Sequence, residues 1–226
     1  MSTPNRLVKT HLELVDAVSR FAGRPLAMAP GRLNALFAAG SAGPILGGGS
    51  VSTRGHVVTA SCIAVVPVVG PLVARSDWLS ELFGAKSYGD VGDAIEAAFA
   101  DPTARAVLLE LDSPGGEVGG LFDLVDRIAS LREESGKPLW AVASETALSA
   151  AYAVASAADR IYVTRTGEVG SVGILAVHVD ESAADAMAGL KWTLIHAGAR
   201  KIDGTPHEPL SGPSFAAIQA DVDMLQ

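Results

Sequence analysis

From residue 60 onward, short apolar runs alternate with segments of helical periodicity, and this alternation limits the fold more than any other feature. The apolar runs Cys62–Val69, Ala106–Asp112 and Leu139–Ser144 have the length of buried strands. The segments Tyr88–Ala100 and Val118–Glu134 between them repeat apolar residues at helical spacing. Repeated strand–helix–strand units predict an α/β fold, with a mainly parallel sheet covered by helices on both faces and wound by right-handed crossovers.

The rest of the chain extends this pattern and divides into two parts. Further elements are predicted beyond residue 148: helix Ser149–Ala158, strands Arg160–Thr164, Val172–Val179 and Trp192–His196, helix Glu181–Gly189 and a last helix from about Pro213. Residues 1–55 are predicted to form an N-terminal arm with a helix at Leu7–Phe21 and a flexible connector at Gly40–Ser50. Residues 56–226 form the compact domain. Within the arm, Leu26–Ala39 is either a frayed segment or a grip on a neighbouring copy.

Composition narrows the classes of protein. The 17 Lys and Arg residues against 25 Asp and Glu residues give a net charge of -8, which makes nucleic acid and anionic membranes poor partners. The longest apolar run, Cys62–Gly70, is much shorter than the ~20 residues of a membrane span. One cysteine cannot form an internal disulfide or a cysteine-based metal site. The five histidines form no H-x-x-x-H pair, so no zinc site is expected.

Two segments at predicted strand ends carry candidate chemistry, because ligands of parallel α/β folds collect there. In Asp112–Gly116 (DSPGG), paired glycines let backbone N–H groups approach a ligand and hold a developing negative charge. An ordinary Pro-Gly turn explains the same residues. Ser149 begins a helix of Ala, Ser and Val that must be central and buried, where the helix dipole favours an oxyanion. A plain serine N-cap is the alternative.

A third segment, the polar loop 197–204, contains Lys201 and follows the predicted strand Trp192–His196. A solvent-exposed lysine is the ordinary expectation for that position. The G-x-S-x-G elbow of many serine hydrolases does not occur, since the nearest match, Gly170–Gly173, lacks the leading glycine. His178 and His196 lie within strand patterns and are better explained as structural residues than as bases.

Taken in order, these motifs resemble one known family. The strand–DSPGG–helix unit is followed by TALSAAYAVASAADRIYV, TGEVGSVGI and GARKIDGTP. This series is similar to the signal-peptide-peptidase-A family of serine peptidases, in its tailed-phage prohead protease branch (minor capsid protein C, or capsid maturation protease). The segments FAGRPLAMAPGRLNALFA and HEPLSGPSFAAIQADVD also fit that branch. The resemblance covers residues 20–226 and implies the ClpP/crotonase-like superhelix of β-β-α units with a Ser–Lys dyad.

The resemblance implies a role for each matching position. Ser149 corresponds to the nucleophile and Lys201 to the general base, while the N–H groups of Gly116 and Ala150 form the oxyanion hole. The supporting positions are Ser171 for orienting the base, and Gly115 and Gly170 for binding the peptide. Two departures exist: Ala150-Ala151 replaces the two glycines of the bacterial type, and no membrane anchor is visible. The second disfavours the clearance of signal peptides from a membrane.

The implied chemistry is self-consistent. A lysine acts as a base only when it is neutral, and burial among apolar groups favours the neutral form. Neutral Lys201 would take the proton of Ser149, which attacks a peptide carbonyl, and water would release the acyl-enzyme. This mechanism needs no metal, nucleotide or other cofactor.

The resemblance thus implies a serine endopeptidase that cleaves scaffold protein, and portal or itself, within the phage prohead in the cytoplasm of the host cell. We expect a homo-oligomeric ring or dome with enclosed active sites. Two alternatives remain: a non-catalytic scaffold-associated prohead protein with an idle dyad, and a crotonase-type acyl-CoA enzyme. For the latter, Glu117 is the one acid near the glycine pair, and no basic cluster for CoA is evident. Helical spacing of apolar residues continues to the last residue, which predicts a domain trimmed from a longer chain.

Overall fold

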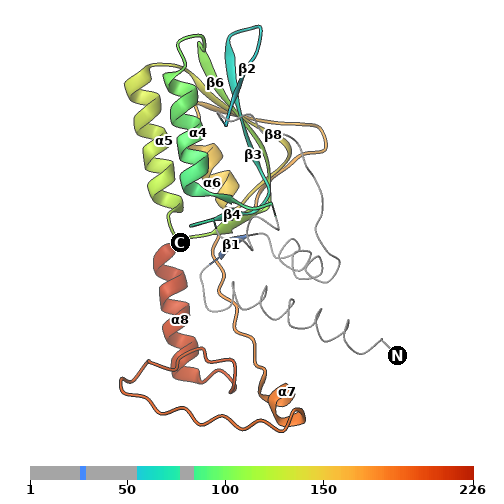
Figure 1. Ribbon diagram of the computed structural model, residues 1–226, viewed down its shortest axis with the longest axis vertical. Helices are drawn as coiled ribbons and strands as arrows, with labels where there is room; N and C mark the ends of the chain where they lie inside the picture. The colour runs from blue at the N-terminus through green and yellow to red at the C-terminus, as the bar shows by residue number, and fades with distance from the viewer. Residues whose placement is uncertain (1–25, 29–54, 77–83) are drawn as a thin grey trace, which may run out of the picture.

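The computed structural model describes residues 26–28, 55–76 and 84–226 (Figure 1). The helix predicted at Leu7–Phe21 and the connector predicted at Gly40–Ser50 lie outside these residues. The division of the chain near residue 55 stays a prediction.

Within the described residues the main sheet has six strands, and its central pairs are parallel. The strand order is β10 (Glu168–Gly170), β8 (Leu139–Leu148), β6 (Ala106–Ser113), β3 (Ile63–Val69) and β2 (Val57–Val58), and β9 (Arg160–Val163) also pairs with β8. The β2–β3 pair is antiparallel, whereas β3–β6, β6–β8, β8–β9 and β8–β10 are parallel. The first half of β8 pairs with β9 and its second half with β10. The predicted mainly parallel α/β fold is confirmed.

Three helices pack on one side of this sheet: α4 (Tyr88–Ala100), α5 (Leu121–Ser135) and α6 (Ala150–Ser156) (Figure 1). On β6 the buried residues alternate, with Val107, Leu109 and Leu111 in the core. Trp140 of β8 and Tyr162 of β9 are exposed and contact each other edge to face. In the described part of the chain, α4, α5 and α6 therefore cover one face of the sheet, and the helices predicted on the other face are not found among these residues.

A second, smaller sheet forms where the main strands end. Its order is β1 (Leu26–Met28), β7 (Gly115–Glu117), β4 (Leu72–Val73) and β5 (Lys86–Ser87). Glu117 is buried and accepts a hydrogen bond from the Ala74 N–H at 2.8 Å through its carboxylate. The Tyr88 hydroxyl donates to the Glu117 carbonyl, and burial together with the nearby Glu117 charge raises the pKa of Tyr88. These bonds fix β7 against the start of α4.

The C-terminal part differs most from the prediction. The helix predicted at Glu181–Gly189 is present as α7 (Ser182–Met187), and the last helix is α8 (Gly212–Leu225) with Ser211 as its N-cap. The strands predicted at Val172–Val179 and Trp192–His196 are wrong, because neither segment forms a strand ladder with the described residues. Leu175 alone makes an isolated bridge, to Leu26.

Asp101, which caps the C-terminal end of α4, supplies a test of the fold in acid. Its carboxylate accepts bonds from the Thr103 N–H at 2.8 Å and the Thr103 hydroxyl at 2.6 Å, and it lies 3.2 Å from His56 Nε2. The Thr103 bonds first, and His56 second, lower the pKa of Asp101 to about 2. A carboxylate with a lowered pKa stabilises the fold above its unfolded pKa, and this contribution disappears as pH falls.

We therefore expect Asp101→Asn to lower the Tm at neutral pH and the gap to the parent protein to close between about pH 4 and 2. Thermal unfolding across pH measures this gap. Asp126→Asn, at an exposed position on α5, is the matched control. A gap that stays constant down to pH 2 contradicts the expectation.

Candidate active site

The DSPGG segment turns the chain sharply from β6 into β7. The Gly115 N–H donates to the Ser113 hydroxyl at 3.3 Å, and Gly115 has φ 95°. A Cβ built on Gly116 would lie 1.8 Å from the carbonyl oxygen of Leu72, because β7 and β4 pair directly there. A side chain at this position is sterically impossible without moving the backbone. Gly116 is thus required by a close strand contact, which an ordinary exposed turn would not need.

Ser149 lies between the end of β8 and the start of α6. Its backbone has φ 53° and ψ -114°, a conformation that L-residues rarely adopt and that costs of order 1–3 kcal/mol. Its N–H donates to the Gly170 carbonyl at 2.7 Å, and its hydroxyl lies 3.5 Å from the Gly173 carbonyl. The hydroxyl makes no capping bond to α6. Ser149 therefore occupies the N-cap position without serving as a side-chain cap.

Helix α6 explains why this strained serine is well fixed. Ala150, Ala151, Val154 and Ala155 are completely buried, so the helix packs with its small residues against the sheet. The N–H of Ala150 belongs to the first turn, where backbone donors have no acceptor within the helix. Such a donor beside the Ser149 hydroxyl suits an oxyanion.

An apolar cavity of about 260 Å³ opens beside Ser149. Its walls come from the start of α5, from α6, from the segment after β10 and from the end of α8. The side chains that define its character are mostly large and apolar: Val118, Phe122, Tyr152, Ile174 and Leu225. A cavity of this kind can receive an apolar side chain next to the nucleophile.

The other predicted positions near the serine are brought together in part. Gly170, at the end of β10, lies next to Ser149 through its carbonyl, and its φ of 121° suits glycine. Ser171 is exposed with φ 53°, and its side chain makes no hydrogen bond with a described residue. The local structure thus supports a contact of Gly170 with the nucleophile and gives Ser171 no partner within the described residues.

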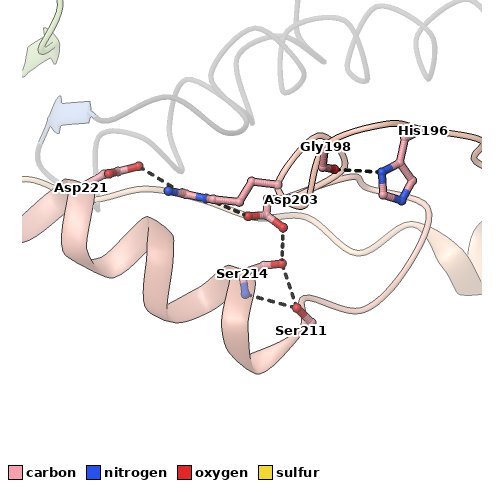
Figure 2. A network of polar contacts seen from close by, with 7 residues as sticks. His196, Gly198, Asp203, Ser211, Ser214 and Asp221 are labelled. Carbon is pink, nitrogen blue, oxygen red and sulfur yellow. Dashed lines mark hydrogen bonds and ion pairs between the residues drawn. The ribbon is translucent and has the colours of Figure 1, made fainter.

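Lys201 is not brought to Ser149 within one chain. Its side chain is exposed and makes no hydrogen bond or ion pair with any residue in the described ranges. The loop that carries it is held along α8 by a polar network (Figure 2). Asp203 accepts from the Ser214 hydroxyl at 2.7 Å and from Arg200 Nε at 3.2 Å, and these bonds lower the pKa of Asp203. Arg200 also lies 3.7 Å from Asp221.

Among the residues that the structure describes, no group of three or more His, Cys, Asp or Glu side chains gathers as a metal site. Among the same residues, no helix is both long and apolar enough to cross a membrane. Glu117, the acid considered for acyl-CoA chemistry, is buried and bonded to the Ala74 N–H, so its role here is structural.

Two features of the site were not predicted from the sequence. The carbonyl of Gly173 faces the Ser149 hydroxyl, and the end of α8 contributes to the cavity wall through Leu225. The apolar spacing of α8 was a weak signal for the second feature, while the first depends on the path of an irregular segment.

Together these residues define a class of protein: a mainly parallel α/β protein with a strained serine at the start of a buried helix, close to a strand-paired glycine. Residues 131–226, which contain both Ser149 and Lys201, match the model of Peptidase family S49.

Relatives from two phages carry the resemblance further. The chain is 41% identical over 161 residues to the head-tail preconnector protein GP5 of Enterobacteria phage P21, covering 71% of this chain and 32% of the relative. It is 38% identical over 161 residues to the capsid assembly protease C of Escherichia phage lambda, covering 71% and 36%. The chain thus spans about a third of the length of these relatives.

Among solved structures, a putative enoyl-CoA hydratase/isomerase from Mycobacterium abscessus is similar with a TM-score of 0.37 and 16% identity, covering 75% of both chains.

The strand contact at Gly116 yields a direct prediction. Gly116→Ala forces a Cβ against the Leu72 carbonyl, so β7 must move away from β4. We expect a lower Tm and the loss of any activity that needs the Gly116 N–H. Gly89→Ala is the control, since Gly89 lies inside α4 with ordinary contact distances, and alanine there adds roughly 0.5–1 kcal/mol of stability. Equal Tm values for the two variants would contradict the steric assignment.

Proposed function

We propose that this chain is a serine endopeptidase with Ser149 as its nucleophile and Lys201 as its general base. The observation that carries the proposal is the state of Ser149. Its backbone is strained, its hydroxyl does not cap the helix, and it lines an apolar cavity. Strain of this kind clusters at active sites because the surrounding structure must maintain it.

The reaction uses side chains and backbone groups that this sequence itself supplies. Ser149 Oγ attacks the peptide carbonyl carbon as its proton passes to a neutral lysine amine. The N–H groups of Gly116 and Ala150 hold the oxyanion. The C–N bond breaks, the lysine returns the proton to the leaving amine, and an ester to Ser149 remains. Water then hydrolyses the ester and restores the serine. Gly115 and Gly170 border the peptide, and Ser171 orients the lysine.

The lysine is supplied by a neighbouring copy of the chain. Lys201 is exposed, and Ser149 makes its hydrogen bonds to Gly170 and Gly173 rather than to the lysine. The segment that carries it runs away from the sheet (Figure 1) and leaves large apolar side chains in solvent, with Ile195 95%, Met187 85% and Val172 77% exposed. Such exposure is typical of a surface that another protein covers. A homo-oligomer would cover these side chains and complete the dyad.

The substrates are proteins of the phage prohead. One relative is called a capsid assembly protease and another a head-tail preconnector protein. The scaffold protein, the portal protein or the chain itself fits an endopeptidase in that setting, which places the enzyme in the prohead within the host cytoplasm. The apolar cavity beside Ser149 favours an apolar substrate residue.

Replacement of either dyad residue tests the mechanism. We expect Ser149→Ala and Lys201→Ala each to reduce cleavage of a scaffold substrate by at least ~10³-fold with little change in Tm. Lys201→Arg should not restore activity, because arginine stays charged. Lys191→Ala, at an exposed position in the same segment, is the control. If a serine-reactive fluorophosphonate fails to label Ser149 in the assembled protein, the non-catalytic alternative is correct.

Oligomers that mix two inactive variants test whether the active site is shared between neighbouring copies. In oligomers that contain Ser149→Ala and Lys201→Ala chains in equal amounts, a site that spans two copies combines an intact serine with an intact lysine about a quarter of the time. Co-expression of the two inactive variants should therefore recover roughly a quarter of the parent activity. Mixed oligomers with no activity would place the lysine in the same chain as the serine.

A further inference from the structure

The described residues of the N-terminal arm, Leu26–Met28, lie between β7 and Leu175, beside the candidate active site. We call this position between β7 and Leu175 the slot. Strand β1 pairs antiparallel with β7, with Leu26 opposite Glu117, Ala27 opposite Gly116 and Met28 opposite Gly115. On its other side, Leu26 exchanges two backbone hydrogen bonds with Leu175, at 2.7 and 2.9 Å. Three residues of the chain thus form a strand between two segments that flank Ser149.

The register of β1 brings the strand toward Ser149, the proposed nucleophile. Continuing the antiparallel pairing by two residues places Met28 level with Gly173, whose carbonyl faces the Ser149 hydroxyl. Backbone groups alternate between the two sides of a strand. Because those of Leu26 face Leu175, those of Ala27 face Gly116. The Gly116 N–H, which the proposed mechanism assigns to the oxyanion hole, is therefore occupied by the Ala27 carbonyl.

The slot also selects side chains. Leu26 is completely buried, so the position level with Glu117 and Leu175 is a closed aliphatic subsite. An extended peptide that adds a strand to an open edge makes the same backbone bonds and places alternate side chains in subsites.

We propose that Leu26–Met28 occupies, within its own chain, the strand position of the peptide substrate, so that the arm competes with substrate until it is displaced. This inference rests on the proposed peptidase function and gives it a substrate class: extended segments with a leucine-like residue in the Leu26 subsite. The occupant is this chain, because the register, the buried side chain and the paired backbone all belong to it.

A disulfide can lock the arm in place. Antiparallel residues that exchange both hydrogen bonds have Cα atoms about 5.5 Å apart, which is within the range of a disulfide. In a Cys62→Ser background, Leu26→Cys with Leu175→Cys should oxidise to an intramolecular bond, seen as a single-chain species on non-reducing gels and by mass spectrometry. A disulfide between two chains, or none at all, would overturn occupancy by the same chain.

The affinity for a peptide then measures whether the slot is accessible, independently of catalysis. The locked protein also carries Ser149→Ala, and the probe is a fluorescent peptide with the sequence of residues 22–32. We expect binding at least roughly tenfold weaker in the oxidised form than in the reduced form, because a locked arm removes the competent state. Leu26→Cys alone is the control and should not respond to reductant. Equal binding in both forms overturns the proposal.

The two proposals fail in different ways. If the reduced double-cysteine protein with intact Ser149 cleaves no protein while the Ser149→Ala form still shows redox-dependent peptide binding, the peptidase function is wrong and the occupied slot stands. If it cleaves equally well when oxidised and when reduced, the slot is not the substrate site and the inference is wrong.

Discussion

The contact between Gly116 and the Leu72 carbonyl oxygen is the constraint on which the rest of the site depends. No Cβ fits there, so β7 can pair with β4 as closely as two backbones allow. That pairing sets the direction of the Gly116 N–H and leaves the other edge of β7 open for β1. It also fixes where α5 begins, and Val118 and Leu121 before and within its first turn wall the cavity beside Ser149.

The sequence predicted those parts of the fold whose signals are local. Helix α4 has its predicted bounds because Ser87 accepts from the Asp90 N–H at its start and Asp101-Pro102 ends it. Local signals could not show in the same way whether the segments Val172–Val179 and Trp192–His196 form strands. A strand exists only where another strand pairs with it, and an apolar pattern alone does not say whether a partner is near.

The candidate site shows the same difference between residues with local signals and residues whose place depends on distant parts of the chain. Ser149 could be found from the small residues behind it, and Gly116 from its place between a strand and a helix, because both report local packing. The position of Lys201 depends on where the segment 171–226 lies relative to the sheet, and its loop is tied to α8 by Arg200 and Asp203. No short pattern encodes that placement, nor the entry of Leu26 between β7 and Leu175.

The left-handed backbone of Ser149 means that its observed conformation is not the one this residue would adopt unaided. Its neighbours hold it there, chiefly the Gly170 carbonyl and the pairing of β10 with β8. Loosening β10 would let the serine relax and its hydroxyl turn away, with every reactive group still present. In the proposed peptidase, reactivity therefore depends on the pairing of β10 with β8, and a copy in which this pairing loosens loses its activity while its core stays folded.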